Sequence, residues 1–159
     1  MRHVDPSKVA YVDETGIDTY LHREYAYARR GEKVVGYICG KKYRRVGIVA
    51  AQMGKNILAP LKYEGTMDST LFEVWFETRL MRELPPECVI VMDNAAFHRK
   101  RRLASITQNY GHTLIFLPPY APEYNPIENF WAWLKDKMRS VLTHFDSFDD
   151  ALCSSFMCN

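Results

Sequence analysis

Long apolar runs are missing from this sequence. No stretch approaches the roughly 20 consecutive apolar residues that a membrane-spanning helix needs. The N-terminal letters MRHVDPSK contain no apolar core of the kind found in signal peptides. Internal repeats and low-complexity segments are missing as well. With 159 residues, 47% hydrophobic and 25% charged, the chain is expected to form one soluble globular domain with no membrane partner.

Cysteine is scarce and shows no metal-binding pattern. The four cysteines are Cys39, Cys88, Cys153 and Cys158, and they include no CxxC pair. None is partnered by a histidine at the spacing of a zinc site. A zinc-finger protein is therefore not indicated, and a reduced, intracellular compartment is the simplest expectation.

An excess of either charge is also missing, since the formal net charge is only +2. The distribution is more informative, because the acids are mostly scattered whereas the bases form clusters, including the unbroken run at residues 99–102. A basic run is usually only a solvated face. Bases that lie beside carboxylates in a cleft are instead candidates for phosphate contacts.

Periodicity predicts an α/β fold. Apolar runs predict strands at residues 8–12, 46–51, 56–63, 88–92 and 113–117, with turns at 13–16 and 53–55. Amphipathic spacing predicts helices at residues 68–84, 99–110 and 147–157, and residues 17–45 are expected to form a hairpin or a long loop. The last two strands should be buried and joined by a right-handed parallel crossover. We therefore expect a mixed five-stranded sheet, three strands antiparallel and the others parallel, with helices on both faces.

A proline-rich loop and an abrupt helix start lie at residues 117–139, LPPYAPEYNPIENFWAWLKDKMR. Asn125 can cap the helix, Pro126 suits its first position, and Glu128 falls in the first turn near the positive end of the helix dipole. Helical spacing predicts one core face, made of Ile127, Phe130, Trp131, Leu134 and Met138. Asn125 and Glu128 also fit a capping box, in which the acid only satisfies a backbone donor.

Three acids are expected to meet at one edge of the sheet. Asp13 and Asp93 each follow a predicted strand, and the loop after residue 117 leads to Glu128 at the same edge. Such acids would repel one another and raise their pKa values unless a divalent cation neutralised them. Carboxylate oxygens suit Mg²⁺ or Mn²⁺, and two such ions support phosphodiester chemistry. Each acid alone also has a structural explanation, as a turn or cap residue.

Three sequence blocks carry a family resemblance: VDETG around Asp13, VIVMDNAAFHR around Asp93 and LPPYAPEYNPIENFWAWLK around Glu128. They resemble the catalytic domain of DDE transposases, and within it the bacterial insertion-sequence transposases related to mariner. Thirty-four residues separate Asp93 from Glu128, which matches that group. The resemblance covers nearly the whole chain, and residues 1–159 are expected to form a single catalytic domain.

The resemblance implies an RNase H-like fold and a metal-dependent enzyme that cleaves DNA and then transfers the strand. Asp13 would bridge two Mg²⁺ ions, replaceable by Mn²⁺, while Asp93 and Glu128 would each hold one. The implied partners are double-stranded DNA, as transposon ends and target, and a second copy of the chain in a homodimer on DNA. The implied location is the bacterial cytoplasm, in association with the nucleoid.

Two further groups of residues have less specific roles. Residues expected to frame the site are Asn94, Pro119, Tyr120, Asn125 and Pro126. Residues expected to contact DNA, mostly through phosphates, are Arg29, Arg30, Lys41, Lys42, Arg44, Arg45, His98, Arg99, Lys135 and Arg139. His98 has the alternative of a structural role in orienting the loop after Asp93.

One feature departs from the family. Only twelve residues precede Asp13, whereas full-length relatives carry a helix-turn-helix region there that recognises transposon ends. The chain is therefore expected to be a truncated copy or one product of a split reading frame. Two alternatives stay open: a non-catalytic DNA-binding or dimerising fragment that modulates a full-length transposase, and another RNase H-like nuclease.

Overall fold

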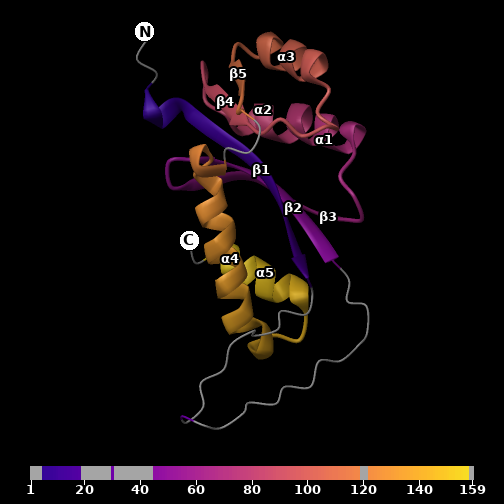
Figure 1. Ribbon diagram of the computed structural model, residues 1–159, viewed down its shortest axis with the longest axis vertical. Helices are drawn as coiled ribbons and strands as arrows, with labels where there is room; N and C mark the ends of the chain where they lie inside the picture. Colours follow the sequence, from indigo (N-terminus) through magenta and orange to yellow (C-terminus); the bar gives the residue numbers. More distant parts are fainter. Residues whose placement is uncertain (1–4, 19–29, 31–44, 119–121, 158–159) are drawn as a thin grey trace.

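A mixed five-stranded sheet forms the centre of the molecule, as predicted. The computed structural model describes residues 5–18, 30, 45–118 and 122–157, and its sheet has the order β3-β2-β1-β4-β5 (Figure 1). The antiparallel part contains β1 (Val9–Asp18), β2 (Arg45–Met53) and β3 (Asn56–Glu64). The parallel part adds β4 (Val89–Met92) and β5 (Thr113–Phe116) to the other side of β1.

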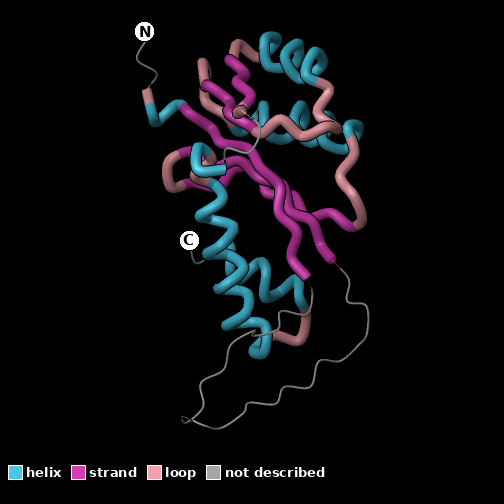
Figure 2. The backbone as a smooth tube through the Cα atoms, in the orientation of Figure 1, coloured by secondary structure: helices cyan, strands magenta, loops and turns pink. Residues whose placement is uncertain are grey.

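The first strand is longer than the sequence predicted. Residues 13–16, expected as a turn, lie inside β1, where Asp13 pairs with Ala50 and Gly16 pairs with Gly47 of β2. The parallel pairing of β1 with β4 ends earlier, at Val12 and Met92. Asp13 is therefore at the end of the parallel pairing but in the middle of its own strand. Figure 2 shows β1 and β2 running on beyond the short β4 and β5.

One face of the sheet is covered by α1, α2 and α3. The helix predicted at residues 68–84 is one run, made of α1 (Ser69–Trp75), a π-helical turn η2 (Phe76–Leu80) and α2 (Met81–Glu83). The Asp68 side chain caps it by accepting from Leu71 N. The next helix, α3 (Lys100–Asn109), ends before Gly111, which adopts a φ of 73°. These helices pack on alternate residues of the sheet, such as Ala10, Val12 and Val49.

The opposite face is covered by α4 (Ile127–Val141) and α5 (Phe148–Met157). All five residues predicted for the core face of α4 are buried, and they pack with Ile17 and Ile48 of the sheet. The remaining elements are short helical turns: η1 (Pro6–Lys8), η3 (Pro122–Tyr124) and η4 (Leu142–His144). Figure 1 shows the two helix groups on either side of the sheet, which confirms helices on both faces.

The prediction that both parallel strands are buried is wrong for β5. Thr113 and Ile115 are exposed, and Ile115 has 45% of its surface accessible. The reason is position, because β5 forms the edge of the sheet beside β4. Its residues contact α3 on one face, whereas α4 and α5 pack against β1 and β2. In the described part of the chain, no helix is long and apolar enough to cross a membrane.

Candidate active site

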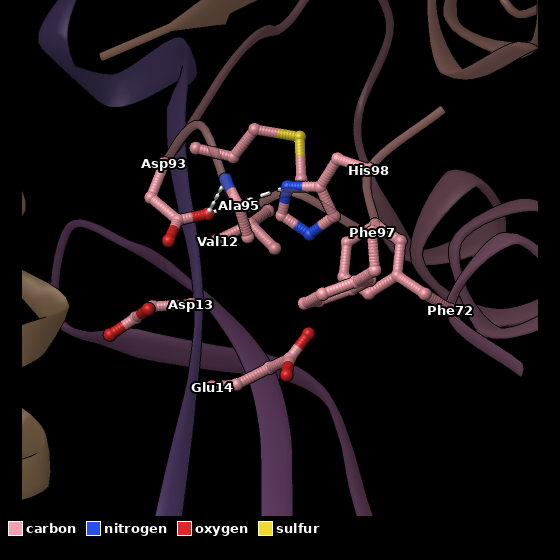
Figure 3. Close-up of a pocket in the computed structure, with 9 residues that line it drawn as sticks. Val12, Asp13, Glu14, Phe72, Asp93, Ala95, Phe97 and His98 are labelled. Atoms are coloured by element: carbon pink, nitrogen blue, oxygen red, sulfur yellow. Dashed lines mark hydrogen bonds and ion pairs between the residues drawn. The ribbon is translucent and has the colours of Figure 1, made fainter. Parts of the chain in front are cut away.

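Alternation along β1 sends two neighbouring acids to opposite faces of the sheet. Asp13 lies on the α4 face, where its Oδ2 accepts a hydrogen bond from the Trp131 indole at 3.0 Å. Glu14 lies on the α1 face, where its Oε2 accepts from the Tyr63 hydroxyl at 3.4 Å. Figure 3 shows the two carboxylates leaving β1 in opposite directions. The strand β1 thus places one acid on each face of the sheet.

Asp93 joins them because it directly follows the strand paired with β1. Val12 and Met92 are partners in the parallel ladder, so Asp13 and Asp93 leave the two strands side by side. Asp13, Glu14, Asp93 and His98 all border one cavity of about 210 Å³ (Figure 3). The predicted meeting of Asp13 and Asp93 at one sheet edge is therefore observed.

The pKa of Asp13 is raised to about 7, from its ordinary value of 3.8. Burial is the largest cause, and the negative charges of Glu128 and Asp93 raise it further. Hydrogen bonds from the Glu14 backbone and the Trp131 side chain oppose the shift. The charges of both other acids therefore act on the Asp13 carboxyl, which is the most buried of the three.

Glu128 lies in the first turn of α4, as predicted, and it is exposed. It is not among the residues that border the cavity. The predicted cap by Asn125 is wrong, because the buried Asn125 side chain donates instead to Val12 O at 3.4 Å. Pro126 precedes the helix, and the backbone N–H of Glu128 donates to Asn125 O at 3.1 Å. Asn125 thus joins the start of α4 to the strand that carries Asp13.

The donor atoms at this edge fit a hard divalent cation. Asp13, Asp93 and Glu128 offer carboxylate oxygens, which are the ligands of Mg²⁺ and Mn²⁺. Burial raises the pKa of Asp13 most, repulsion by Glu128 and Asp93 adds to it, and a bound cation would offset both effects. Within the described residues, however, no three His, Cys, Asp or Glu side chains are gathered closely enough to hold one ion. The carboxylate ligands therefore suit a divalent cation, and Glu128 lies apart from the cavity that Asp13 and Asp93 border.

Two residues at the site were missed by the sequence analysis. Glu14 was assigned to a turn, although the alternation rule could have placed it beside the site once β1 was extended through Asp18. Trp131 was expected only as a core residue, and its indole N–H also bonds Asp13. The sequence carries no signal for that bond, because it depends on how α4 lies across β1.

The predicted DNA-contact residues fall into different environments. Arg30, Arg45 and Arg139 are exposed, and Lys135 is partly buried. Arg99 instead pairs with Glu73 of α1, with Nε 3.1 Å from Oε1, and donates to Thr70. His98 is buried with its side chain only 4% accessible, which favours the structural alternative over a phosphate contact. Asn94 follows Asp93 and is exposed.

Six predicted site residues lie outside the described residues: Arg29, Lys41, Lys42, Arg44, Pro119 and Tyr120. Their predicted roles stay predictions.

A family model for DDE superfamily endonucleases matches residues 8–151, and this range includes all three acids. The chain belongs to the DDE superfamily endonucleases. One curated relative of this DDE endonuclease is the uncharacterized protein y4pE/y4sA of Sinorhizobium fredii. It is 39% identical over 62 residues, which are 39% of this chain and 43% of that protein.

Solved structures share the fold of this DDE endonuclease. The Mos1 transposase paired-end complex with left transposon end aligns with a TM-score of 0.76 and 14% identity, covering 99% of this chain and 50% of that one. The Mos1 transposase catalytic domain with raltegravir and Mg gives 0.66 and 14%, covering 99% and 75%. The catalytic core domain of BIV integrase gives 0.57 and 14%, covering 94% and 81%. The fold is thus the RNase H-like core of transposases and integrases, and the chain spans about half of the paired-end transposase.

Proposed function

We propose that this chain is a transposase catalytic domain that cleaves DNA at transposon ends and transfers the strand into target DNA. The observation that carries the proposal is the placement of Asp13 and Asp93. They leave parallel neighbouring strands side by side and border one cavity, in a chain that belongs to the DDE endonucleases. The two hydrophobic cores share β1 and β2, which supports a single catalytic domain over residues 1–159.

The three acids are proposed to hold Mg²⁺, with Mn²⁺ as a substitute. Asp13 would contact both ions of a pair, Asp93 one of them and Glu128 the other. Such ions, when bound, supply Lewis-acid activation of an attacking oxygen and stabilise the leaving oxygen. The three carboxylates would hold these cations in place, and Trp131 orients the Asp13 carboxylate through its indole N–H.

The reaction proposed for this site has two steps that conserve atoms. In the first step, water attacks a phosphodiester, the bond from phosphorus to the 3′ oxygen breaks, and a 3′-hydroxyl and a 5′-phosphate are released. In the second, that 3′-hydroxyl attacks a target phosphodiester, so one P–O bond forms as another breaks. Neither step needs a redox cofactor.

Double-stranded DNA is the proposed partner. The exposed arginines Arg30, Arg45 and Arg139, together with Lys135, would contact DNA phosphates. Such contacts give affinity without recognising the DNA sequence. Handling two DNA ends suits a homodimer on DNA, which we include in the proposal. Association with the nucleoid in the bacterial cytoplasm would follow from that substrate.

The experiment is nicking of supercoiled plasmid DNA with Mn²⁺ or Mg²⁺. Wild type is expected to convert plasmid to the open circle, and Asp93→Asn is expected to lose at least 100-fold in rate, because a carboxamide is a poor ligand for the cation. Asp136→Asn, an exposed acid on α4, is the matched control and should nick like wild type. Equal nicking by wild type and Asp93→Asn would overturn the proposal. DNA binding without any nicking would favour the non-catalytic fragment.

A further inference from the structure

Buried polar atoms without partners gather around the cavity behind Asp93. Within the described part of the chain, Oε1 of Glu14 and both ring nitrogens of His98 are buried and make no hydrogen bond of good geometry. Both residues border the cavity of about 210 Å³. Buried polar atoms that stay unpaired destabilise the folded protein, so this cavity favours a polar occupant.

His98 is one wall of this cavity, and it contacts Asp93. Its Nδ1 lies 3.4 Å from Oδ1 of Asp93, and the same oxygen accepts from the backbone N–H of Ala95 at 3.3 Å. A backbone N–H and a ring nitrogen thus face one carboxylate oxygen. Figure 3 shows the other oxygen of Asp93 turned away from the His98 ring.

The imidazole of His98 is held in place by aromatic rings. Its centroid is 4.5 Å from that of Phe72 and 4.3 Å from that of Phe97. These contacts fix the ring plane, so Nε2 is directed to one side. Figure 3 shows the Nε2 edge turned toward the side of the cavity where Glu14 lies.

Glu14 forms the opposite wall of the cavity, and a hydrogen bond also holds its side chain in place. Tyr63 of β3 donates to Oε2 at 3.4 Å, which leaves Oε1 as the unpartnered oxygen. The Tyr63 ring reaches Glu14 by lying across Gly47, where an added Cβ would come within 2.2 Å of the ring. The glycine is therefore required for the position of Tyr63.

We propose that Glu14 and His98 are positioning residues that orient Asp93 for the divalent cation through ordered water in this cavity. Water molecules would bridge Nε2 of His98 and Oε1 of Glu14, and Nδ1 of His98 would hold Oδ1 of Asp93. The cavity has ample room, since one water needs about 10–15 Å³. Residues that orient metal ligands commonly change metal affinity by about 10–100-fold. The inference rests on the proposed function, because it assumes that Asp93 is a cation ligand.

The test measures Mn²⁺ affinity of the full chain by calorimetric titration at one pH, without DNA. His98→Phe keeps the ring packing but removes both nitrogens, and it is expected to weaken Mn²⁺ binding about tenfold. His98→Asn, whose amide can replace the donor at Nδ1, is expected to recover part of that loss. Glu14→Leu is expected to weaken binding in the same direction. His144→Phe, an exposed histidine on η4, is the control and should bind like wild type.

A second readout separates positioning from simple loss of folding. Nicking of plasmid DNA by His98→Phe and Glu14→Leu should recover at saturating Mn²⁺, because excess cation offsets weaker binding. Asp93→Asn should not recover. Thermal unfolding of each variant identifies those that fail to fold, and His98→Asn then carries the test.

The outcomes distinguish the two proposals. If Asp93→Asn weakens Mn²⁺ binding while His98→Phe, His98→Asn and Glu14→Leu all bind like wild type, the positioning role is overturned and the proposed function stands. If Asp93→Asn itself binds Mn²⁺ like wild type, the metal site of the proposed function fails and the positioning role fails with it.

Discussion

Asp13 and Glu14 are adjacent in sequence, and burial raises the pKa of each carboxyl to about 7. For Glu14 burial is the largest cause, the Tyr63 hydrogen bond opposes it, and the charges of Asp13 and Asp93 add to it. The strand therefore carries two acids whose charged forms are disfavoured in the folded protein. A bound cation would relieve this for Asp13, whose carboxylate is a proposed ligand.

The first prediction concerns the stability of the metal-free protein. The pKa of Asp13 rises on folding from 3.8 to about 7, so its contribution to stability is present below about pH 4 and is lost as the pH rises through 7. Asp13→Asn cannot ionise and avoids this loss. In EDTA, the variant should gain about 2–4 kcal/mol relative to wild type between pH 4.5 and pH 8, measured by urea unfolding. A stability difference that does not change with pH would contradict the raised pKa.

The second prediction concerns Trp131. Its indole N–H bonds Oδ2 of Asp13 and lowers the pKa of that carboxyl. Trp131→Phe keeps an aromatic ring in the core but removes the donor, so the charged form of Asp13 becomes less favourable. Mn²⁺ affinity at pH 7 should fall about tenfold, since a hydrogen bond to a charged group contributes about 1.5–3 kcal/mol. Trp133→Phe, a half-exposed tryptophan on the same helix, serves as the control; unchanged affinity in Trp131→Phe would refute the role of the bond.

At the scale of the element, Asn125 fixes the start of α4 to β1. Its buried amide donates to Val12 O, one residue before Asp13. This contact sets the distance between Glu128 and Asp13 more directly than a helix cap would. The proline-rich sequence predicted a rigid entry to α4, but it did not predict which backbone group Asn125 would bind.

The third prediction tests this connection. Asn125→Ala removes the hydrogen bond that joins the start of α4 to Val12 of β1, so the free energy of unfolding should fall by about 1–3 kcal/mol in urea denaturation. The nicking rate should fall with it, because Glu128 lies in the turn that this bond helps to position. Asn125→Asp lacks the N–H donor and should be destabilised at least as much near neutral pH. A variant Asn125→Ala with wild-type stability would show that the bond is unimportant.

The elements were predictable where periodicity was local and strong. The five core residues of α4, the strand before Asp93 and the turn at Gly54 appear in the structure as the sequence indicated. The turn at residues 13–16 was wrong because DETG contains typical turn residues, whereas the pairing with β2 across Gly16 and Gly47 extends the strand. The burial of β5 was wrong because an apolar run does not reveal whether its strand lies at an edge.

The site was predictable to a similar degree. Asp13 and Asp93 converge because they directly follow Val12 and Met92, the last pair of the parallel ladder, although β1 itself continues beyond Asp13. The contacts that hold the side chains of Glu14 and His98 could not be foreseen, since they depend on Tyr63 from β3 and Phe72 from α1. The pairing of Arg99 with Glu73 likewise depends on how α3 lies beside α1.

At the scale of the whole molecule, one sheet separates two helix layers (Figure 1). Asp13 and Asp93 lie where the pairing of β1 with β4 stops. Lys135 and Arg139, which are proposed to contact DNA, lie on α4. Arg99 and Arg102, at the start of α3, instead pair with Glu73 of α1 and Glu77 of η2. We therefore expect DNA on the side of the sheet that carries α4.

The fourth prediction concerns salt dependence. Fluorescence anisotropy would measure the binding constant for a short DNA duplex. Its logarithm should fall linearly with the logarithm of the salt concentration. Arg139→Ala should weaken binding uniformly across sequences and reduce the magnitude of the slope by about one. Arg82→Ala, an exposed arginine of α2 on the other helix layer, should leave the slope unchanged. Equal effects of both substitutions would argue against a defined DNA face.

The central claim is that Asp13, Asp93 and Glu128 act as one site, and Glu128 tests it most directly because it does not border the cavity. The measurement is the rate of plasmid nicking in Mn²⁺ by Glu128→Gln, compared with Glu123→Gln on the preceding turn. We expect at least a 100-fold loss for Glu128→Gln and a wild-type rate for Glu123→Gln. A wild-type rate for Glu128→Gln, in a preparation where Asp93→Asn is inactive, would contradict it.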